Sequence, residues 1–176
     1  IQAAGESGAG SFQGQQVFQV GSQWVQRQVL QCQFEEQRFA RLPESGWSLL
    51  VSDMERMLPE MRELQRRFRF IPDWRNDDVM LSYAPDGASV GPHVDRYDVF
   101  LLQVQGERRW SISEHYQERY LQDTDLEILQ GFDTEQQYLL QAGDMLYLPP
   151  RVAHHGVAVG DDCMTCSIGF RTPASG

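Results

Sequence analysis

Lysine is absent from this chain of 176 residues, and all 15 of its basic residues are arginines. A protein without lysine cannot form a Schiff base, hold pyridoxal phosphate covalently or build a Walker P-loop. Long apolar runs are missing as well, since no stretch approaches the roughly 18 residues that a membrane-spanning helix needs. We therefore expect neither these kinds of chemistry nor a membrane partner.

Cysteine is scarce, with residues at positions 32, 163 and 166 alone. Three unevenly spaced cysteines cannot make a disulfide framework. Cys163 and Cys166 have the spacing of a redox or half-zinc motif, but no second such pair completes a zinc site and the surrounding run is apolar. We interpret both as small strand residues in a reducing, cytoplasmic setting. The first residues, IQAAGESGAG, also lack the features of a secretory signal.

Positive charge is the minority sign, with 25 acidic residues against 15 basic ones and a net charge of −10. This balance opposes binding to a nucleic-acid backbone and suits a cationic partner. With 41% hydrophobic and 11% aromatic residues, the chain has the composition of a globular domain. We predict a flexible lead-in at residues 1–15, rich in glycine, serine and glutamine, and one domain over residues 16–176.

The first half of this domain shows two different periodicities. Between residues 18 and 39 glutamines alternate with apolar residues, which predicts half-buried strands in a hairpin broken at Gly21. Between residues 46 and 70 apolar residues, including Leu50 and a methionine stripe, recur at helical spacing. This spacing predicts a helix capped by Ser48 or Ser52, and Pro59 should kink it or begin a second helix.

From residue 78 onward, short apolar segments alternate with turns rich in glycine and proline. Many short strands after a helix predict a mainly β domain, a barrel or sandwich with a helical flank. The region 115–135 is polar and is expected to be a loop or a short helix. The expected strands are DVMLSYA, YDVFLLQVQ ending at Gly106, RRWSIS, the two around AGD, HHGVAVG and CMTCSIGF.

Histidine is also rare, but three of the four histidines stand beside predicted strand ends. His93 and Asp95 form a His-x-Asp pair whose side chains share one face of an extended chain. A further histidine follows the run GDMLYLPPRVA, and periodicity alone leaves open whether His154 or His155 faces the same site. Two imidazoles and one carboxylate make a facial triad that leaves positions open on non-haem Fe(II) for a co-substrate and oxygen.

Two adjacent arginines follow the turn at Gly106. Iron enzymes with such a triad usually take 2-oxoglutarate, whose distal carboxylate needs a fixed cation, and arginine offers a two-pronged one. Arg108 and Arg109 point to opposite faces of a strand, so one of them should enter the barrel. Trp110 shares the face of Arg108, and we expect both on the inner face.

Four stretches of the sequence resemble the JmjC-like cupin oxygenases, and more narrowly the bacterial ribosomal oxygenases that hydroxylate an arginine of a large-subunit ribosomal protein. The resemblance extends from about residue 46 to residue 173, which is roughly three quarters of the chain. The stretches are WSLLV (47–51), IPDWRNDDVMLSYAPDGASVGPHVDRYDVFLLQVQGERRW (71–110), LQAGDMLYLPPRVAHHGVA (140–158) and SIGFRTP (167–173).

The resemblance implies a double-stranded β-helix with Fe(II) at one end and 2-oxoglutarate and O₂ as co-substrates. It favours His154 over His155, so the implied metal ligands are His93, Asp95 and His154. Arg108 would clamp the distal carboxylate of 2-oxoglutarate with Ser82 as its hydroxyl partner. The implied lining of the pocket for the substrate arginine consists of Asp77, Tyr97 and Ser167.

The resemblance also implies a partner, a basic ribosomal protein of the large subunit. The family's C-terminal dimerisation region and winged-helix domain are absent from this sequence, so the homodimer expected of the full-length protein is not expected to form through them here. Three alternatives remain open: hydroxylation of a histidine, action on another substrate such as a histone tail or a small molecule, and an inactive cupin that only binds.

Overall fold

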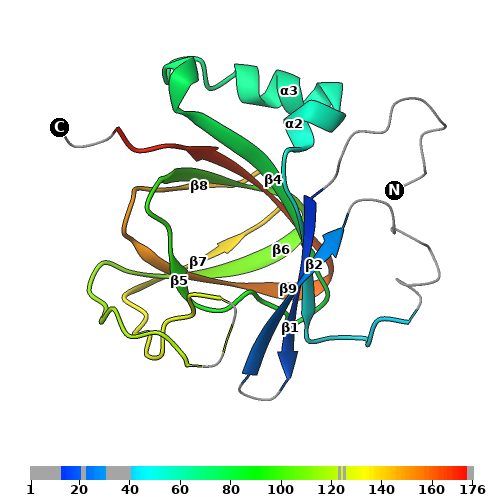
Figure 1. The fold of residues 1–176 in the computed structure, drawn as a ribbon, viewed down its shortest axis with the longest axis vertical. Coiled ribbons are helices and arrows are strands. Elements are labelled where there is room, and N and C mark those ends of the chain that lie inside the picture. The colour runs from blue at the N-terminus through cyan, green and yellow to red at the C-terminus, as the bar shows by residue number, and fades with distance from the viewer. Residues whose placement is uncertain (1–12, 21–22, 31–40, 123, 125, 174–176) are drawn as a thin grey trace.

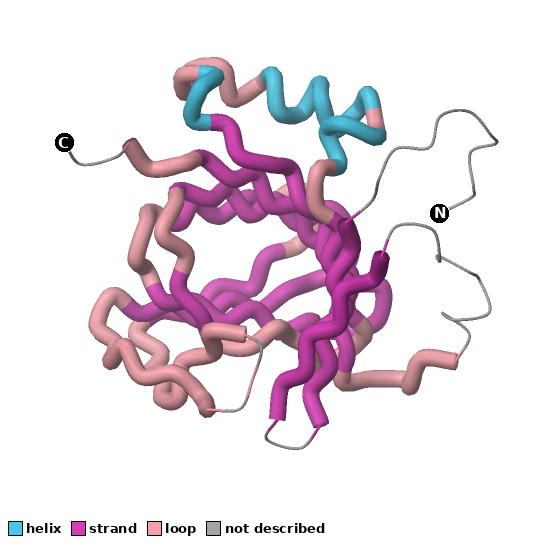
Figure 2. The backbone as a smooth tube through the Cα atoms, viewed as in Figure 1, coloured by secondary structure: helices cyan, strands magenta, loops and turns pink. Residues whose placement is uncertain are grey.

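A computed structural model describes residues 13–20, 23–30, 41–122, 124 and 126–173. Its nine strands form one antiparallel sheet in the order β2-β1-β3-β4-β9-β6-β7, with β5 paired to β9 and β8 paired to β6. The sheet curls around an interior, and the helices lie outside it (Figures 1 and 2). The predicted mainly β fold with flanking helices is confirmed.

The elements are β1 (Gln13–Val20), β2 (Gln23–Leu30), β3 (Trp47–Val51), α2 (Met54–Met57), α3 (Pro59–Arg66), the 3-10 turn η1 (Asp73–Arg75), β4 (Asn76–Ala84), β5 (His93–Val94), β6 (Asp98–Ser113), β7 (Gln136–Leu140), β8 (Met145–Leu148) and β9 (Ala153–Phe170).

The predicted N-terminal hairpin exists as β1 and β2, which pair from Gln13↔Leu30 to Val20↔Gln23. Its first strand begins at Gln13, so residues 13–15 belong to a strand and not to the predicted lead-in. The rest of the lead-in, the break at Gly21, residues 31–39 of the predicted strands and Cys32 lie outside the described residues. β1 continues the sheet by pairing with β3, as its position in Figure 1 shows.

The predicted helix over residues 46–70 is partly wrong. Residues 47–51, including Leu50, form β3, because this segment pairs with β1 on one side and β4 on the other. The helical part begins at Met54, and its N-cap residue is Asp53, whose side chain makes no capping hydrogen bond. The predicted caps Ser48 and Ser52 are therefore wrong. Pro59 begins α3 at its first turn, where a missing N–H costs nothing.

The helical layer packs on the outer face of β4 and β9 through a hydrophobic cluster. Met54 and Phe68 of this layer contact Val79, Ile168 and Phe170 of the sheet, and the methionine stripe lines the same contact. Burying each of these side chains contributes about 1.5–3 kcal/mol. The methionines are therefore core residues, as the sequence suggested.

Two long strands replace pairs of short ones. β6 runs without interruption past Gly106, where the sequence predicted an end, and β9 joins the last two predicted strands. The register between β6 and β9 shifts near Gln105, and Gly106 absorbs the irregularity with φ +64. Cys163 and Cys166 are free, buried residues of β9, which confirms their interpretation as strand residues.

The segment between β6 and β7 forms a loop with one isolated bridge, Tyr120↔Leu129, as its polar composition predicted. Two contacts anchor the loop. The Leu129 N–H donates to the Pro92 carbonyl, next to β5, at 2.8 Å, and the side chain of Ile128 is buried in a small hydrophobic cluster. His115 is exposed, as expected, and pairs with Glu135. None of the described helices is long and apolar enough to cross a membrane.

Gly106→Ala should destabilise the protein by about 1–3 kcal/mol, the cost of a strained backbone position. An alanine Cβ at this left-handed position would lie 3.0 Å from the Asp162 carbonyl oxygen. Gly87→Ala is the matched control, because Gly87 has φ +70 with no heavy atom within 4 Å of an added Cβ. Urea unfolding should show the larger loss for Gly106→Ala. Equal losses of unfolding free energy in the two variants would mean that the close contact between β6 and β9 does not contribute to the destabilisation.

Candidate metal and co-substrate site

Three potential metal ligands meet where β5 lies against the start of β9. His93 and His154 are direct partners in the antiparallel register, and Asp95 follows two residues after His93. One ligand atom from each of the three residues lies within 4.8 Å of the others. The His154 Nε2 is 3.6 Å from an Asp95 carboxylate oxygen, and the two imidazole centroids are 4.3 Å apart. The sequence therefore identified three side chains that do converge.

His155 turns to the other face of β9, as alternation requires. Its ring lies 6.2 Å from the ring of Phe132 in an edge contact, and it takes no part in the three-residue cluster. The geometry thus separates the two neighbouring histidines, which periodicity alone could not do.

Backbone carbonyls orient both imidazoles. The Nδ1 of His93 is 2.9 Å from the Gly91 carbonyl oxygen, and the Nδ1 of His154 is 3.0 Å from that of Val152. A carbonyl only accepts, so Nδ1 donates in each ring and Nε2 is the nitrogen available to a metal. This second contact is the usual way in which proteins fix a metal-binding histidine.

Burial keeps the imidazole of His154 neutral. It lowers the pKa of His154 to about 3, and the neighbouring His93 adds to the effect. Burial also raises the pKa of Asp95, against the opposing effects of His93 and of a hydrogen bond from Tyr97. A carboxylate in this position, beside the neutral imidazole of His154, is unfavourable without a cation. A divalent metal would supply that cation, and two nitrogens with one carboxylate oxygen suit Fe(II).

Arg108 is a buried cation without a counterion in the part of the chain that the structure describes. Its side chain is 3% exposed, and neither Nε nor Nη2 has a hydrogen-bond partner among the described residues. Burial lowers its pKa, and its nearest polar neighbour is the Cys163 thiol. A guanidinium in this condition fits an anionic ligand that the protein itself does not provide. Arg109, by contrast, is exposed.

A polar floor lies on the inner face next to Arg108. Ser82 is 9% exposed, and its hydroxyl donates to the Thr165 carbonyl at 3.3 Å. The Thr165 hydroxyl donates to Gln103 Oε1 at 2.8 Å, and Gln103 Nε2 contacts the Cys163 sulfur at 3.4 Å. The donation by Ser82 is long, so its hydroxyl can turn toward a ligand at little cost.

A β-bulge at the start of β4 brings two adjacent aspartates to one place. Asn76 pairs with Phe170 and Val79 with Ile168, so Asp77 and Asp78 together oppose Gly169. A Cβ added at Gly169 would lie 3.6 Å from the Asp77 Cβ, 3.6 Å from an Asp78 oxygen and 3.7 Å from the Tyr97 ring. Bulges often redirect side chains next to active sites. Asp78 is the residue that sequence reasoning missed here, because alternation gives no sign of a bulge.

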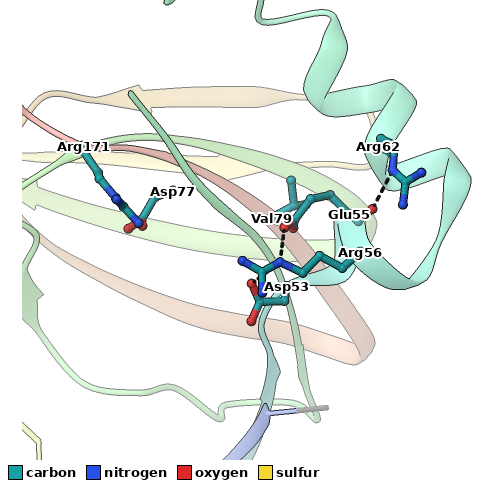
Figure 3. Close-up of polar contacts among 7 residues, drawn as sticks. All are labelled: Asp53, Glu55, Arg56, Arg62, Asp77, Val79 and Arg171. Atoms are coloured by element: carbon teal, nitrogen blue, oxygen red, sulfur yellow. Dashed lines mark hydrogen bonds and ion pairs between the residues drawn. The ribbon is translucent and has the colours of Figure 1, made fainter. Parts of the chain in front are cut away.

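The two aspartates differ in their partners. Asp77 accepts from Arg171 Nε at 2.9 Å, as Figure 3 shows, on an exposed part of the surface. Asp78 has no cationic partner among the described residues, and burial followed by the charge of Asp77 raises its pKa. Tyr97 lies between this pair and the triad, because burial and then the charges of Asp95, Asp78 and Asp77 raise the pKa of its hydroxyl.

Ser167 shares the inner face of β9 with Thr165 and Gly169, two residues away on either side. It is half-buried and pairs in register with Met80 and Leu101. All three residues expected to line a substrate pocket, Asp77, Tyr97 and Ser167, therefore lie on or beside one wall that leads to Asp95.

The fold and the cluster of two histidines and one aspartate define a class of protein, and comparison with known families identifies it. Residues 63–176 match the family described as JmjC domain. The chain belongs to this family, and the double-stranded β-helix expected from the resemblance is confirmed as the family's fold.

Individual relatives narrow the comparison to ribosomal oxygenases. The chain is 44% identical over 142 residues to a probable ribosomal oxygenase of Haemophilus influenzae, a match that covers 78% of this chain and 34% of that protein. It is 40% identical over 136 residues to the ribosomal protein uL16 3-hydroxylase of Escherichia coli, with 77% and 36% covered. The chain spans about a third of the length of these curated relatives.

A solved structure of the E. coli ribosomal oxygenase YcfD, in complex with cobalt and 2-oxoglutarate, is also similar. It superposes with a TM-score of 0.78 at 34% identity, covering 93% of this chain and 41% of that one. The resemblance stated from the sequence is thereby confirmed.

His93→Ala should weaken Co(II) binding by more than about 100-fold, since the loss of even an outer hydrogen-bond partner costs 10- to 100-fold. Titration of the visible absorption of bound Co(II) would measure the affinity. His155→Ala is the matched control, because His155 neighbours His154 but faces the other way. Tight binding by His93→Ala would exclude the three-residue site.

Proposed function

We propose that this chain is the catalytic domain of an Fe(II)- and 2-oxoglutarate-dependent oxygenase that hydroxylates an arginine side chain of a ribosomal protein. One observation carries the proposal. The chain places a convergent set of metal ligands and a buried arginine without a counterion on one inner face of a JmjC domain. The names of its relatives support a ribosomal protein as the substrate.

In this proposal His93, Asp95 and His154 hold the metal through two Nε2 atoms and one carboxylate oxygen. Iron(II) in such a site supplies the activation of O₂, coupled to oxidative decarboxylation of 2-oxoglutarate, that inserts oxygen into a C–H bond. The carbonyls of Gly91 and Val152 accept from Nδ1 of each ring and so leave Nε2 as the nitrogen for the metal. The Tyr97 hydroxyl favours the charged form of the Asp95 carboxylate.

Arg108 and Ser82 bind and orient the co-substrate. The guanidinium pairs with the distal carboxylate, and the Ser82 hydroxyl donates to the same group. Because Arg108 is buried, this ion pair is poorly screened by solvent and strongly fixes the position of the ligand. The buried surroundings also keep water away from the reacting atoms.

The charge of the wall beside the candidate metal ligands supports arginine as the target residue. Two adjacent aspartates oppose one glycine there, and Asp78 has no cation among the described residues. A guanidinium that enters a partly dry pocket needs such paired negative charge, whereas a neutral imidazole does not. The wall therefore supports arginine over histidine, and the net charge of −10 suits a basic ribosomal protein.

Mass spectrometry tests the reaction directly. Ribosomal proteins incubated with the domain, Fe(II), ascorbate and 2-oxoglutarate should gain one oxygen on an arginine of one large-subunit protein. Oxygen on a histidine would move the proposal to the alternative target. Absence of succinate with every substrate would indicate a binding module without turnover.

Arg108→Gln should raise the KM for 2-oxoglutarate by roughly 30-fold or more, because truncation of one partner of a buried charge pair costs about 2–5 kcal/mol. Succinate formation at increasing 2-oxoglutarate concentrations measures this change. Arg109→Gln, the neighbour on the exposed face, should leave the KM within about twofold. The reverse pattern would assign the clamp to Arg109.

Asp78→Asn should raise the KM for the ribosomal protein by about 10- to 100-fold and leave uncoupled decarboxylation of 2-oxoglutarate unchanged. The reason is that one charge-assisted pair to the substrate is lost, at about 1.5–3 kcal/mol. Asp77→Asn should have a smaller effect, because Asp77 already pairs with Arg171. Normal kinetics in both variants would make the aspartates structural.

A further inference from the structure

Unsatisfied polar atoms are concentrated on one part of the inner face. Among the described residues, four buried side-chain nitrogen or oxygen atoms have no hydrogen-bond partner, and three of these belong to Arg108 and Trp110. A buried donor without a partner costs about as much as a lost hydrogen bond, so each such atom needs an explanation. Arg108 is explained by the proposed carboxylate ligand, but the indole N–H of Trp110 is not.

The β6–β9 register shows where Trp110 lies. Along the inner face, Ile112 pairs with His154, Trp110 with Gly156, and Arg108 with Ala158. Trp110 is thus halfway between the metal ligand and the arginine clamp. Its ring centroid is 5.8 Å from the His154 ring and 5.8 Å from the Arg108 guanidinium carbon. A ligand that reaches from the metal to Arg108 must pass this ring.

Gly156 fixes the orientation of the indole. A Cβ added at Gly156 would lie 2.6 Å from Cζ3, 2.7 Å from Cη2 and 2.9 Å from Cε3 of Trp110. The face of the six-membered ring of the indole therefore covers Gly156 and fills the space that a side chain at position 156 would take. The Nε1 atom belongs to the five-membered ring and is not among the indole atoms nearest to Gly156.

We propose that the Trp110 indole N–H donates a hydrogen bond to the bound 2-oxoglutarate, and that Trp110 is a co-substrate-binding residue besides Arg108 and Ser82. This inference rests on the proposed function. The ligand offers carboxylate and keto oxygens along its length, and an indole N–H can only donate. A hydrogen bond to a carboxylate in this buried setting would satisfy the unpaired atom and restrict how the ligand turns about the Arg108 contact.

Nuclear magnetic resonance of the indole groups tests the contact without a substitution at the site. In ¹⁵N-labelled, Zn(II)-loaded protein, addition of 2-oxoglutarate should move the Trp110 Nε1–H signal downfield and slow its exchange with solvent. The signal is assigned by its absence from Trp110→Phe. Trp47, whose Nε1 donates to the Pro43 carbonyl at 2.7 Å, and the exposed Trp74 serve as internal references and should not move.

Calorimetry provides the second measurement. Trp110→Phe keeps an aromatic ring but has no N–H, and it should raise the Kd for 2-oxoglutarate about tenfold, the equivalent of about 1.4 kcal/mol. Gly156→Ala should raise it as well, because the added Cβ displaces the ring. Trp74→Phe, on the surface, should bind like the wild type.

The outcomes separate this inference from the proposed function. If wild-type protein binds 2-oxoglutarate and Arg108→Gln does not, but the Trp110 signal stays in place and Trp110→Phe binds normally, the hydrogen bond does not exist. If the wild type itself fails to bind 2-oxoglutarate, the proposed function fails. Should Trp110→Phe not fold, substitution of the other three tryptophans one at a time assigns the Trp110 signal by elimination, and its shift in the wild type decides alone.

Discussion

The antiparallel pairing of β6 with β9 is the constraint on which this site depends. It fixes the candidate metal ligand His154, then Gly156, and then the proposed clamp Arg108, side by side and in order on one inner face. The same strand β9 pairs with β5, which brings His93 and Asp95 to His154 from the other side. Neither strand pair could form the proposed site alone, because the candidate metal ligands lie at the β5–β9 pair and the candidate clamp lies in the β6–β9 pair.

Because this inner face is buried, a charged or polar group on it costs more free energy when it lacks a partner. A guanidinium and a carboxylate lie where solvent compensates their charges poorly, and the guanidinium has no anionic partner among the described residues. A bound anion would lower the free-energy cost of burying that guanidinium. The helical layer, packed on the outer face by apolar contacts, takes no part in this chemistry and holds the sheet in shape.

The sequence predicted correctly those features that depend on the local alternation of side chains along the chain. The His-x-Asp spacing, the choice of an inward arginine and the start of α3 at Pro59 all follow from local geometry. It failed where long-range pairing overrides local signals. Leu50 has helical spacing but lies in β3 because strands on both sides take its hydrogen bonds, and β6 continues past Gly106 because β9 supports it there. The bulge that directs Asp78 toward Gly169 has no sequence signature, since it is a property of two strands.

The close contact between Gly156 and the Trp110 ring limits how the sequence of this domain can change during evolution. An indole at position 110 and a missing side chain at position 156 are two halves of one fit, because any Cβ there would overlap the ring. Substitution at one position alone produces either a clash or a void. Related domains should therefore vary at these two positions as a correlated pair, with a smaller ring at the first wherever the second carries a side chain.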